Sequence, residues 1–236
     1  MNKTTISLVS FALLAILGIF GSCGNANKQS QEVDTFKTAD LILCELQGHV
    51  KEVVATTFNT DKDFNKIEDE SSTPIKLTYA YTKDGKIAIF ESIDFTQVVD
   101  DMKSVYTRNN NGEIMRIDSK SNLNYDERNY YYIYEWNNGL PSEKQYSGWE
   151  WGSATKFYYG ENYLCTKAIE IFTEYESIIE TEYNYEYTEF DSNNNWITCK
   201  NIMNIVTKEE DPFTGQSSIA SKEQKYSITE RIIKYY

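Results

Sequence analysis

Residues that commonly carry out enzyme chemistry are sparse in this chain. His49 is the only histidine, so a serine or cysteine nucleophile has at most one candidate imidazole base. The sequence contains no Gly-x-Ser-x-Gly elbow, no HExxH and no phosphate-binding GxxxxGK[ST] or GxGxxG motif. His49 is more simply explained as a residue at the start of a strand. Motifs therefore assign no catalytic residue.

Carboxylates, in contrast, are abundant. The chain has 36 Asp and Glu against 23 Lys and Arg, a net charge of -13. Two carboxylates at a set separation can hydrolyse a glycosidic bond, but the sequence selects no pair among so many. The acidic balance also disfavours nucleic-acid binding, which usually needs a basic surface.

One acidic segment matches part of a calcium loop. Asp191-x-Asn193-x-Asn195 provides the first three oxygen ligands, but Ile202 stands at the twelfth position, where a glutamate belongs. Asp and Asn are also the ordinary residues of turns. We therefore predict a turn here, and neither a metal site nor another cofactor.

The N-terminal residues have the layout of a secretory signal. Residues 1–22 contain Lys3 and then an apolar run from Ile6 to Phe20. The segment Phe20-Gly21-Ser22-Cys23 resembles the bacterial lipobox, with phenylalanine where leucine is commonest. This resemblance implies lipidation of Cys23, whereas the alternative is an ordinary secretory signal with a chance cysteine. Gly24 stands where an aspartate would favour the inner membrane, so we expect a lipid-anchored protein of the outer membrane, on its periplasmic or cell-surface face.

Three further cysteines, Cys44, Cys165 and Cys199, follow in the mature chain. An odd number cannot pair completely within one molecule. Cys165 and Cys199 each lie in an apolar, alternating segment, where a buried free thiol acts as a small hydrophobe. A Cys165–Cys199 bridge in an oxidising compartment is the alternative, and the sequence leaves both open.

Aromatic residues are the remaining candidates for a binding surface, since the chain has 19 tyrosines. If some are exposed on a concave face, they suit stacking on sugar rings or contact with a protein. Tyr131, Trp149 and Trp151 are the best candidates for exposed ligand contacts, although cross-strand packing is the simpler explanation of the cluster. The densest cluster comprises Tyr130, Tyr131, Tyr132, Tyr134, Trp136, Trp149, Trp151, Tyr158 and Tyr159.

The pattern around these residues predicts β-hairpins. Tyrosines alternate from Tyr183 to Tyr187, an Asn-rich turn follows, and a second strand begins at Trp196. Gly85, Gly112 and Gly139 recur at intervals of 27 residues, each in a turn between two apolar strands.

The first of these hairpins also has a predicted register. A three-residue loop with Gly85 in the left-handed conformation places Tyr81 opposite Ile87 and Tyr79 opposite Ile89. After it, Phe95, Val98, Val99 and Met102 fit either a short helix or a bulged strand.

These elements predict an all-β fold, an antiparallel meander of repeated hairpins that forms a curved or rolled sheet. We expect the lipoprotein signal peptide over 1–22, the lipidated cysteine and a flexible tether over 23–40, and a single domain over 41–236. Loops are expected over 60–73 and 209–218, with a closing strand over 226–236.

The units Tyr79-x-Tyr81 to Gly85-x-Ile87, Tyr106 to Gly112-x-Ile114 and Tyr183-x-Tyr185-x-Tyr187 to Asn195-Trp196-Ile197 resemble YD-type repeats. With the lipobox, they make the chain similar to small lipoproteins of Gram-negative gut bacteria that carry such repeats. The resemblance implies a long meander and transfers no catalytic residue.

The sequence thus favours a non-enzymatic binding or structural module, whose aromatic face contacts a glycan or an envelope protein. A glycan-active hydrolase is the first alternative. A toxin or immunity component is the second, although the chain is short and lacks an effector domain.

Overall fold

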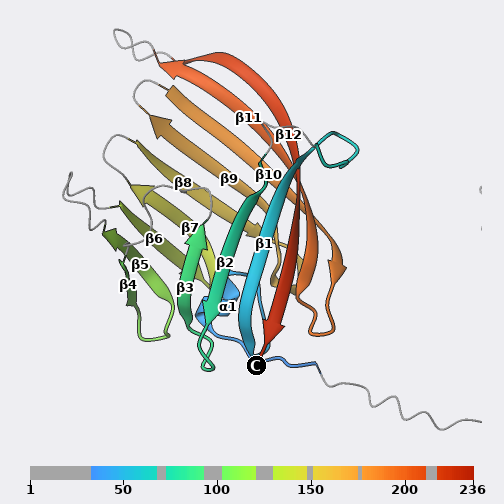
Figure 1. The fold of residues 1–236 in the computed structure, drawn as a ribbon. Coiled ribbons are helices and arrows are strands. Elements are labelled where there is room, and N and C mark those ends of the chain that lie inside the picture. The colour runs from blue at the N-terminus through green and yellow to red at the C-terminus, as the bar shows by residue number, and fades with distance from the viewer. Residues whose placement is uncertain are drawn as a thin grey trace, which may run out of the picture. The chain divides into compact units, whose positions relative to one another are not determined.

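The computed structural model of the chain describes residues 33–67, 73–92, 103–120, 130–147, 151–174, 177–210 and 217–236. Residues 33–236 form one compact unit with its own sheet and core (Figure 1). The expected signal peptide, Cys23, Trp149 and the segment 95–102 lie outside the described residues. Residues 33–40, expected to belong to the tether, are part of the compact unit.

A single twelve-stranded antiparallel sheet makes up nearly all of this unit, which confirms the predicted all-β meander. Neighbours in sequence are neighbours in the sheet except the third and fourth strands, which are its two edges. In addition, the last strand returns to pair with the first. The strands are β1 (Val50–Thr60), β2 (Ile75–Tyr81), β3 (Ile87–Ser92), β4 (Lys103–Arg108), β5 (Ile114–Lys120), β6 (Tyr130–Asn137), β7 (Leu140–Ser147), β8 (Trp151–Tyr159), β9 (Cys165–Glu174), β10 (Ser177–Phe190), β11 (Trp196–Glu210) and β12 (Ser217–Tyr235). A 3-10 turn, η2 (Glu161–Tyr163), connects β8 to β9.

The sheet order is β3-β2-β1-β12-β11-β10-β9-β8-β7-β6-β5-β4. β12 is nine residues longer at its start than the closing strand expected from Tyr226, because it pairs with β11 along nearly its whole length. In Figure 1 the sheet curves, so that one of its faces is concave.

The turns follow from residues that tolerate a left-handed backbone. Gly85, Gly112 and Gly139 have φ of +73°, +81° and +75°, which side-chain-bearing residues adopt only with strain. They connect β2 to β3, β4 to β5 and β6 to β7. Hairpin turns alternate between the two ends of a meander, so every second turn lies at the same end. These three turns, 27 residues apart, are such alternate turns and lie at one end of the sheet.

The predicted register of the first hairpin is half right. Tyr81 pairs with Ile87 as expected, but Tyr79 pairs with Phe90 rather than Ile89. A bulge between Ala80 and Tyr81 moves the pairing by one residue. The extra residue is Ala88 on β3, so the bulge lies within the strand and not in the loop.

Residues 33–49, which we call the N-terminal plug, lie at this same end of the sheet. The plug contains the single turn of helix α1 (Ala39–Leu43), whose first turn is capped by the Thr38 hydroxyl, an acceptor for the Leu41 N–H at 3.2 Å. The same hydroxyl donates to the Gly85 carbonyl at 2.6 Å. Farther along, the Gln47 N–H donates to Asn195 Oδ1 in the β10–β11 turn at 2.8 Å. The plug therefore spans turns that lie far apart in sequence.

The plug also links the two edge strands, β3 and β4. Asp40, which is 1% exposed, accepts a hydrogen bond from the Ile87 N–H of β3 at 2.7 Å. Its two oxygens also accept from the Arg108 guanidinium of β4. No backbone pairing joins β3 to β4 within the described residues. We call the unpaired boundary between these two edge strands the seam, and Asp40 connects its two sides.

The hydrophobic core lies where the plug meets the sheet. Leu41 and Leu46 of the plug are buried against Val50, Val53 and Tyr81. The best-packed part of the concave face is therefore the end that carries the plug.

Candidate ligand-binding site

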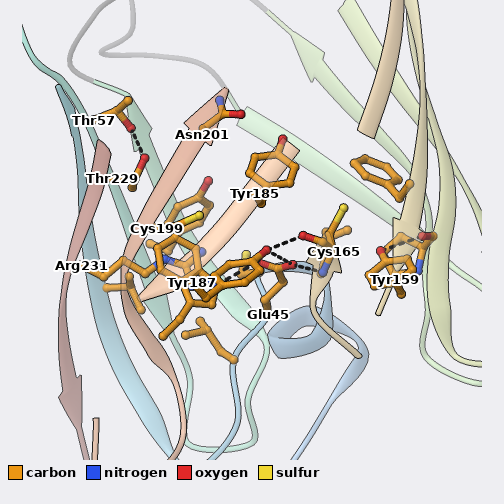
Figure 2. Close-up of a pocket in the computed structure, with 18 of the residues that line it drawn as sticks. Glu45, Thr57, Tyr159, Cys165, Tyr185, Tyr187, Cys199, Asn201, Thr229 and Arg231 are labelled. Atoms are coloured by element: carbon orange, nitrogen blue, oxygen red, sulfur yellow. Dashed lines mark hydrogen bonds between the residues drawn. The ribbon is translucent and has the colours of Figure 1, made fainter. Parts of the chain in front are cut away.

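A cavity of about 360 Å³ lies between the plug and the concave face of the sheet (Figure 2). Its wall is mainly aromatic and apolar, with three thiols and two charged groups. The lining residues are Leu43, Cys44, Glu45, Leu46, Val53, Thr57, Tyr79, Pro141, Phe157, Tyr159, Cys165, Tyr185, Tyr187, Trp196, Cys199, Asn201, Ser227, Thr229 and Arg231.

Strand alternation explains which residues reach this cavity. Side chains two residues apart share a face, so Cys199 and Asn201 on β11 point inward with Thr229 and Arg231 on β12. Cys199 is the backbone partner of Thr229 in the ladder. The intervening residues of these strands face the outer side.

The first charged group in the cavity, Glu45, is held by three donors from three strands. One of its oxygens accepts from the Cys165 N–H at 2.8 Å, and the other accepts from Trp196 Nε1–H at 2.8 Å. The Tyr187 hydroxyl lies 3.0 and 3.2 Å from the two oxygens and 2.7 Å from the Cys165 carbonyl. Figure 2 shows Glu45 pointing from the plug toward Tyr187 and Cys165. The carboxylate is therefore fixed and largely satisfied.

Arg231, the second charged group, lies on the other side of Trp196. Its guanidinium carbon is 3.3 Å from the centre of the indole ring, a close cation–π contact. Its Nε and Nη1 atoms are buried and have no hydrogen-bond partner among the described residues. Asn201 Oδ1 is also buried without a partner there.

The cavity changes the ionisation of the groups around it. Burial raises the pKa of the Cys44 thiol to about 11 and that of Cys199 to about 12. Burial and then the charge of Glu45 raise the pKa of Tyr187 far above its ordinary value. The Arg231 charge acts in the opposite direction on the pKa of Cys44 and Cys199. The hydroxyl and the thiols are therefore neutral at physiological pH.

All three cysteines of the compact unit line this cavity as free thiols. The alternative of a Cys165–Cys199 bridge does not fit, because β10 lies between β9 and β11. Two strand spacings separate the Cα atoms by about 10 Å, whereas a disulfide needs them within about 7 Å. The structure therefore supports the alternative that Cys165 and Cys199 are buried free thiols.

The residues predicted to contact a ligand do not form one surface. Tyr131 lies on the outer face, with its ring centre 4.2 Å from the Arg116 guanidinium. Trp151, which is 38% exposed, lies on the concave face and contacts Tyr146 and Phe172, with ring centres 4.7 and 5.8 Å away. Trp149 lies outside the described residues. The described pair is thus divided between opposite faces, and Trp151 takes part in the cross-strand packing that was the simpler explanation.

The calcium-like segment is a turn, as predicted. Asp191 Oδ1 accepts from the backbone N–H groups of Asn193 and Asn195, each at 2.9 Å, and its second oxygen accepts from the Tyr235 hydroxyl. Its carboxylate is therefore occupied by protein donors. The part of the chain that the structure describes contains no cluster of three or more His, Cys, Asp or Glu side chains arranged to hold a metal ion.

His49 lies directly before β1, at the strand start where it was expected. Its ring stacks on Phe36 at 4.3 Å, and Nδ1 is 2.7 Å from Asp34. The hydrogen bond from His49 lowers the pKa of Asp34. These contacts tie the start of the plug to its end, and neither His49 nor Asp34 is among the residues that line the cavity.

Sequence reasoning missed both charged residues of the cavity. The inward direction of Arg231 could have been predicted, because it lies at alternate positions along the strand with the apolar Ile233 and Tyr235. Residues two and four positions apart share one face of a strand. Glu45 had none, since it lies in an irregular segment whose partners are more than a hundred residues away.

No known protein-family model matches this chain, and a comparison with curated proteins found no match either. Among the described residues, no helix has the length and apolar character needed to cross a membrane.

Proposed function

We propose that this protein is a non-enzymatic, lipid-anchored binding module of the outer membrane, and that the cavity beneath the plug receives a small ligand. The cavity is the observation that carries the proposal. It combines a wall of aromatic rings with a few polar groups held in place by other residues, which is the usual composition of a ligand pocket.

The size and the lining of the cavity favour a small molecule over a protein segment. About 360 Å³ is at the lower end of the range for small-molecule sites. Tyr159, Tyr185 and Tyr187 present ring surface to it, and such rings bind flat apolar groups or the faces of sugar rings. A single glycan unit therefore suits the cavity better than an envelope protein does.

The hydrolase alternative has less support at this site. Glycoside hydrolysis uses two carboxylates that flank the bond, and the described lining contains one, Glu45. Its oxygens already accept hydrogen bonds from Cys165, Trp196 and Tyr187. A carboxylate occupied in this way is a structural anchor for the plug.

The cavity can be tested with N-phenyl-1-naphthylamine, an uncharged aromatic probe whose fluorescence rises in apolar sites. A soluble form that begins at Gly24 should bind it in a saturable manner. Asn201→Trp, which fills the cavity, should weaken binding at least about tenfold, which corresponds to about 1.4 kcal/mol. Thr188→Trp, on the exposed outer side of β10, is the matched control and should bind like the parent. Equal binding by both variants, with unchanged far-UV circular dichroism and melting temperature, would exclude the cavity as the site.

The anchor needs a separate test. In a Gram-negative host, the unaltered chain should fractionate with the outer membrane and incorporate labelled fatty acid. Cys23→Ser should abolish both, because multiple acyl chains are what hold such a protein to a bilayer. A membrane-bound, labelled Cys23→Ser protein would contradict the anchor.

A further inference from the structure

We propose that the ligand of this cavity carries an anionic group, and that Arg231 binds that group. The inference rests on the proposed function, since it specifies the chemistry of the molecule that occupies the same cavity. It starts from the one basic side chain in the described lining.

Arg231 is placed to bind an acceptor, and the described residues supply none to its Nε and Nη1 atoms. A buried guanidinium normally pairs with a carboxylate or with carbonyl groups, because an unpaired buried charge is costly. Here Nε and Nη1 are both buried without a hydrogen-bond partner among the described residues. A ligand oxygen that bears negative charge would satisfy these donors and balance the charge.

Glu45 is the carboxylate in the described lining and so the candidate for an internal partner of Arg231, but its oxygens accept hydrogen bonds from other residues. Trp196 separates the two groups: its Nε1–H donates to Glu45, and its ring face lies against Arg231. The described residues contain no ion pair between Glu45 and Arg231. The carboxylate is therefore used by the protein, while the guanidinium remains available.

The stacking on Trp196 also positions the guanidinium in advance. The guanidinium carbon lies 3.3 Å from the ring centre, so the indole ring restricts the position of the group before a ligand binds. A donor group held rigid before binding loses little freedom on binding, and a planar guanidinium suits an oxyanion better than a lysine does.

A second unpaired atom, Asn201 Oδ1, lines the same cavity. Asn201 pairs with Ser227 across the β11–β12 ladder, and Arg231 lies four residues farther along β12. At about 3.3 Å per residue, the two side chains emerge about 13 Å apart. A molecule with an anionic end, an aromatic or ring-shaped body and a hydrogen-bond donor at its far end would satisfy both.

Two probes that differ by one anionic group test this inference. The first is 1-anilinonaphthalene-8-sulfonate, and the second is N-phenyl-1-naphthylamine, which has the same rings and no sulfonate. The soluble form that begins at Gly24 should bind the sulfonate at least about tenfold more tightly. Arg231→Gln should abolish that preference, measured as the ratio of the two affinities in the same variant, so that a change in the cavity wall common to both probes cancels.

Controls separate a specific effect from a general loss of charge or fold. Lys234→Gln removes one positive charge from the exposed, outer side of the same strand and should keep the preference. Arg231→Lys retains the charge without the planar donors and should keep part of it. Near-UV circular dichroism and the melting temperature show whether each variant is folded. The ratio of the two probe affinities for the parent tests the inference even if a variant does not fold.

The outcomes distinguish this inference from the proposed function. Saturable binding of both probes with equal affinity, or a preference that survives in folded Arg231→Gln, would overturn the anionic ligand while leaving the cavity as a binding site. Failure of both probes to bind the parent would overturn the proposed function itself.

Discussion

Trp196 is the residue through which the interior is organised. It is 6% exposed, donates through its indole N–H to Glu45 and presents its ring face to Arg231. One side chain thus separates an anion that belongs to the structure from a cation that is left available. The different roles proposed for these two groups follow from this separation.

The structural role of Glu45 predicts a large effect on stability. Glu45→Ala leaves the Cys165 N–H and Trp196 Nε1–H without their acceptor, whereas the Tyr187 hydroxyl keeps the Cys165 carbonyl. The free energy of unfolding should therefore fall by about 3 kcal/mol. Glu45→Gln keeps an acceptor oxygen and should cost about half as much. Urea denaturation of the form that begins at Gly24 measures both.

The neighbouring carboxylate of Glu186 provides the control for this measurement. It lies on the exposed outer side of β10, next to Tyr187 in the chain, so Glu186→Ala should change the free energy of unfolding by less than about 0.5 kcal/mol. Equal losses for Glu45→Ala and Glu186→Ala would show that the plug is not held by Glu45.

At this scale, sequence patterns predict the inward or outward direction of a side chain better than its partners. Strand parity indicates that Arg231 points inward, and it separates Tyr131 from Tyr132. Parity could not place Glu45, because no period extends through the plug. Nor could it show that Trp151 packs against Phe172, since that contact depends on the β8–β9 register.

At the scale of elements, the plug and the turns at one end of the sheet depend on each other. The β2–β3 turn approaches the plug so closely that a Cβ added at Gly85 would lie 2.7 Å from Thr38 Cγ2 and 2.9 Å from Phe36 Cε1. The turn at Gly112 has the same backbone conformation, with φ of +81°, but nothing lies within 4 Å of an added Cβ.

This pair of glycines separates backbone strain from plug docking. Gly112→Ala should lower the free energy of unfolding by about 1–2 kcal/mol, the cost of a left-handed L-residue. Gly85→Ala carries the same strain together with the clash, so it should lose at least about 1 kcal/mol more. Thermal and urea unfolding compare the two variants, and hydrogen exchange should show faster exchange in residues 33–49 only for Gly85→Ala. Similar losses in both would mean that the turn does not support the plug.

The seam between the edge strands gives a second prediction for the elements. Asp40 connects α1 to Ile87 on β3 and to Arg108 on β4. Asp40→Ala leaves the Ile87 N–H unpaired and removes the carboxylate partner of the part-buried Arg108 guanidinium, which keeps its hydrogen bond to the Gly112 carbonyl. The substitution should cost about 3 kcal/mol.

A double-mutant cycle with Arg108→Met tests whether the ion pair carries this cost. The double variant should be more stable than the sum of the single losses implies, with a coupling energy of at least about 1 kcal/mol. Additive losses would show that Asp40 and Arg108 act independently.

The elements were predictable to the extent that they repeat. The glycine intervals and the alternating tyrosines correctly indicated the hairpins and the meander. The register shift between Ala80 and Tyr81 depends on the exact geometry of the two strands. The alternation of residue types does not specify that geometry. The sequence predicts residues 33–40 of the plug as part of a tether, because the plug makes its contacts with distant turns, such as those at Gly85 and Asn195, and not with neighbours in sequence.

At the scale of the whole unit, the concave face buries several tyrosine hydroxyls and cysteine thiols. Burial raises the pKa of Tyr79, Tyr134, Tyr159, Tyr183, Tyr185 and Tyr187 above the ordinary value. The single-layer sheet achieves this because its curvature and the plug enclose one of its faces. The face keeps these groups un-ionised well into the alkaline range.

This enclosure predicts that the fold loses stability at high pH. Burial raises the pKa of the Cys165 and Cys199 thiols from 9.0 to about 11 and about 12. Between pH 9.0 and the raised pKa of each thiol, the unfolded chain releases a proton that the folded chain retains. The free energy of unfolding therefore falls as pH rises through this range. Each such group contributes about 1.4 kcal/mol per pH unit. Stability should be nearly constant from about pH 7 to pH 8.5 and should then fall steeply.

Urea midpoints measured across this range test the expectation, and Cys199→Ala identifies its origin. Removing one raised thiol should make the decline above pH 9 shallower by about 1.4 kcal/mol per pH unit, because that group no longer releases a proton on unfolding. A cavity left by the missing sulfur lowers stability at every pH and so leaves the slope unaffected. The same slope in the parent and in Cys199→Ala would show that this thiol ionises as readily in the folded protein as in the unfolded chain, and that the concave face is open to water at Cys199.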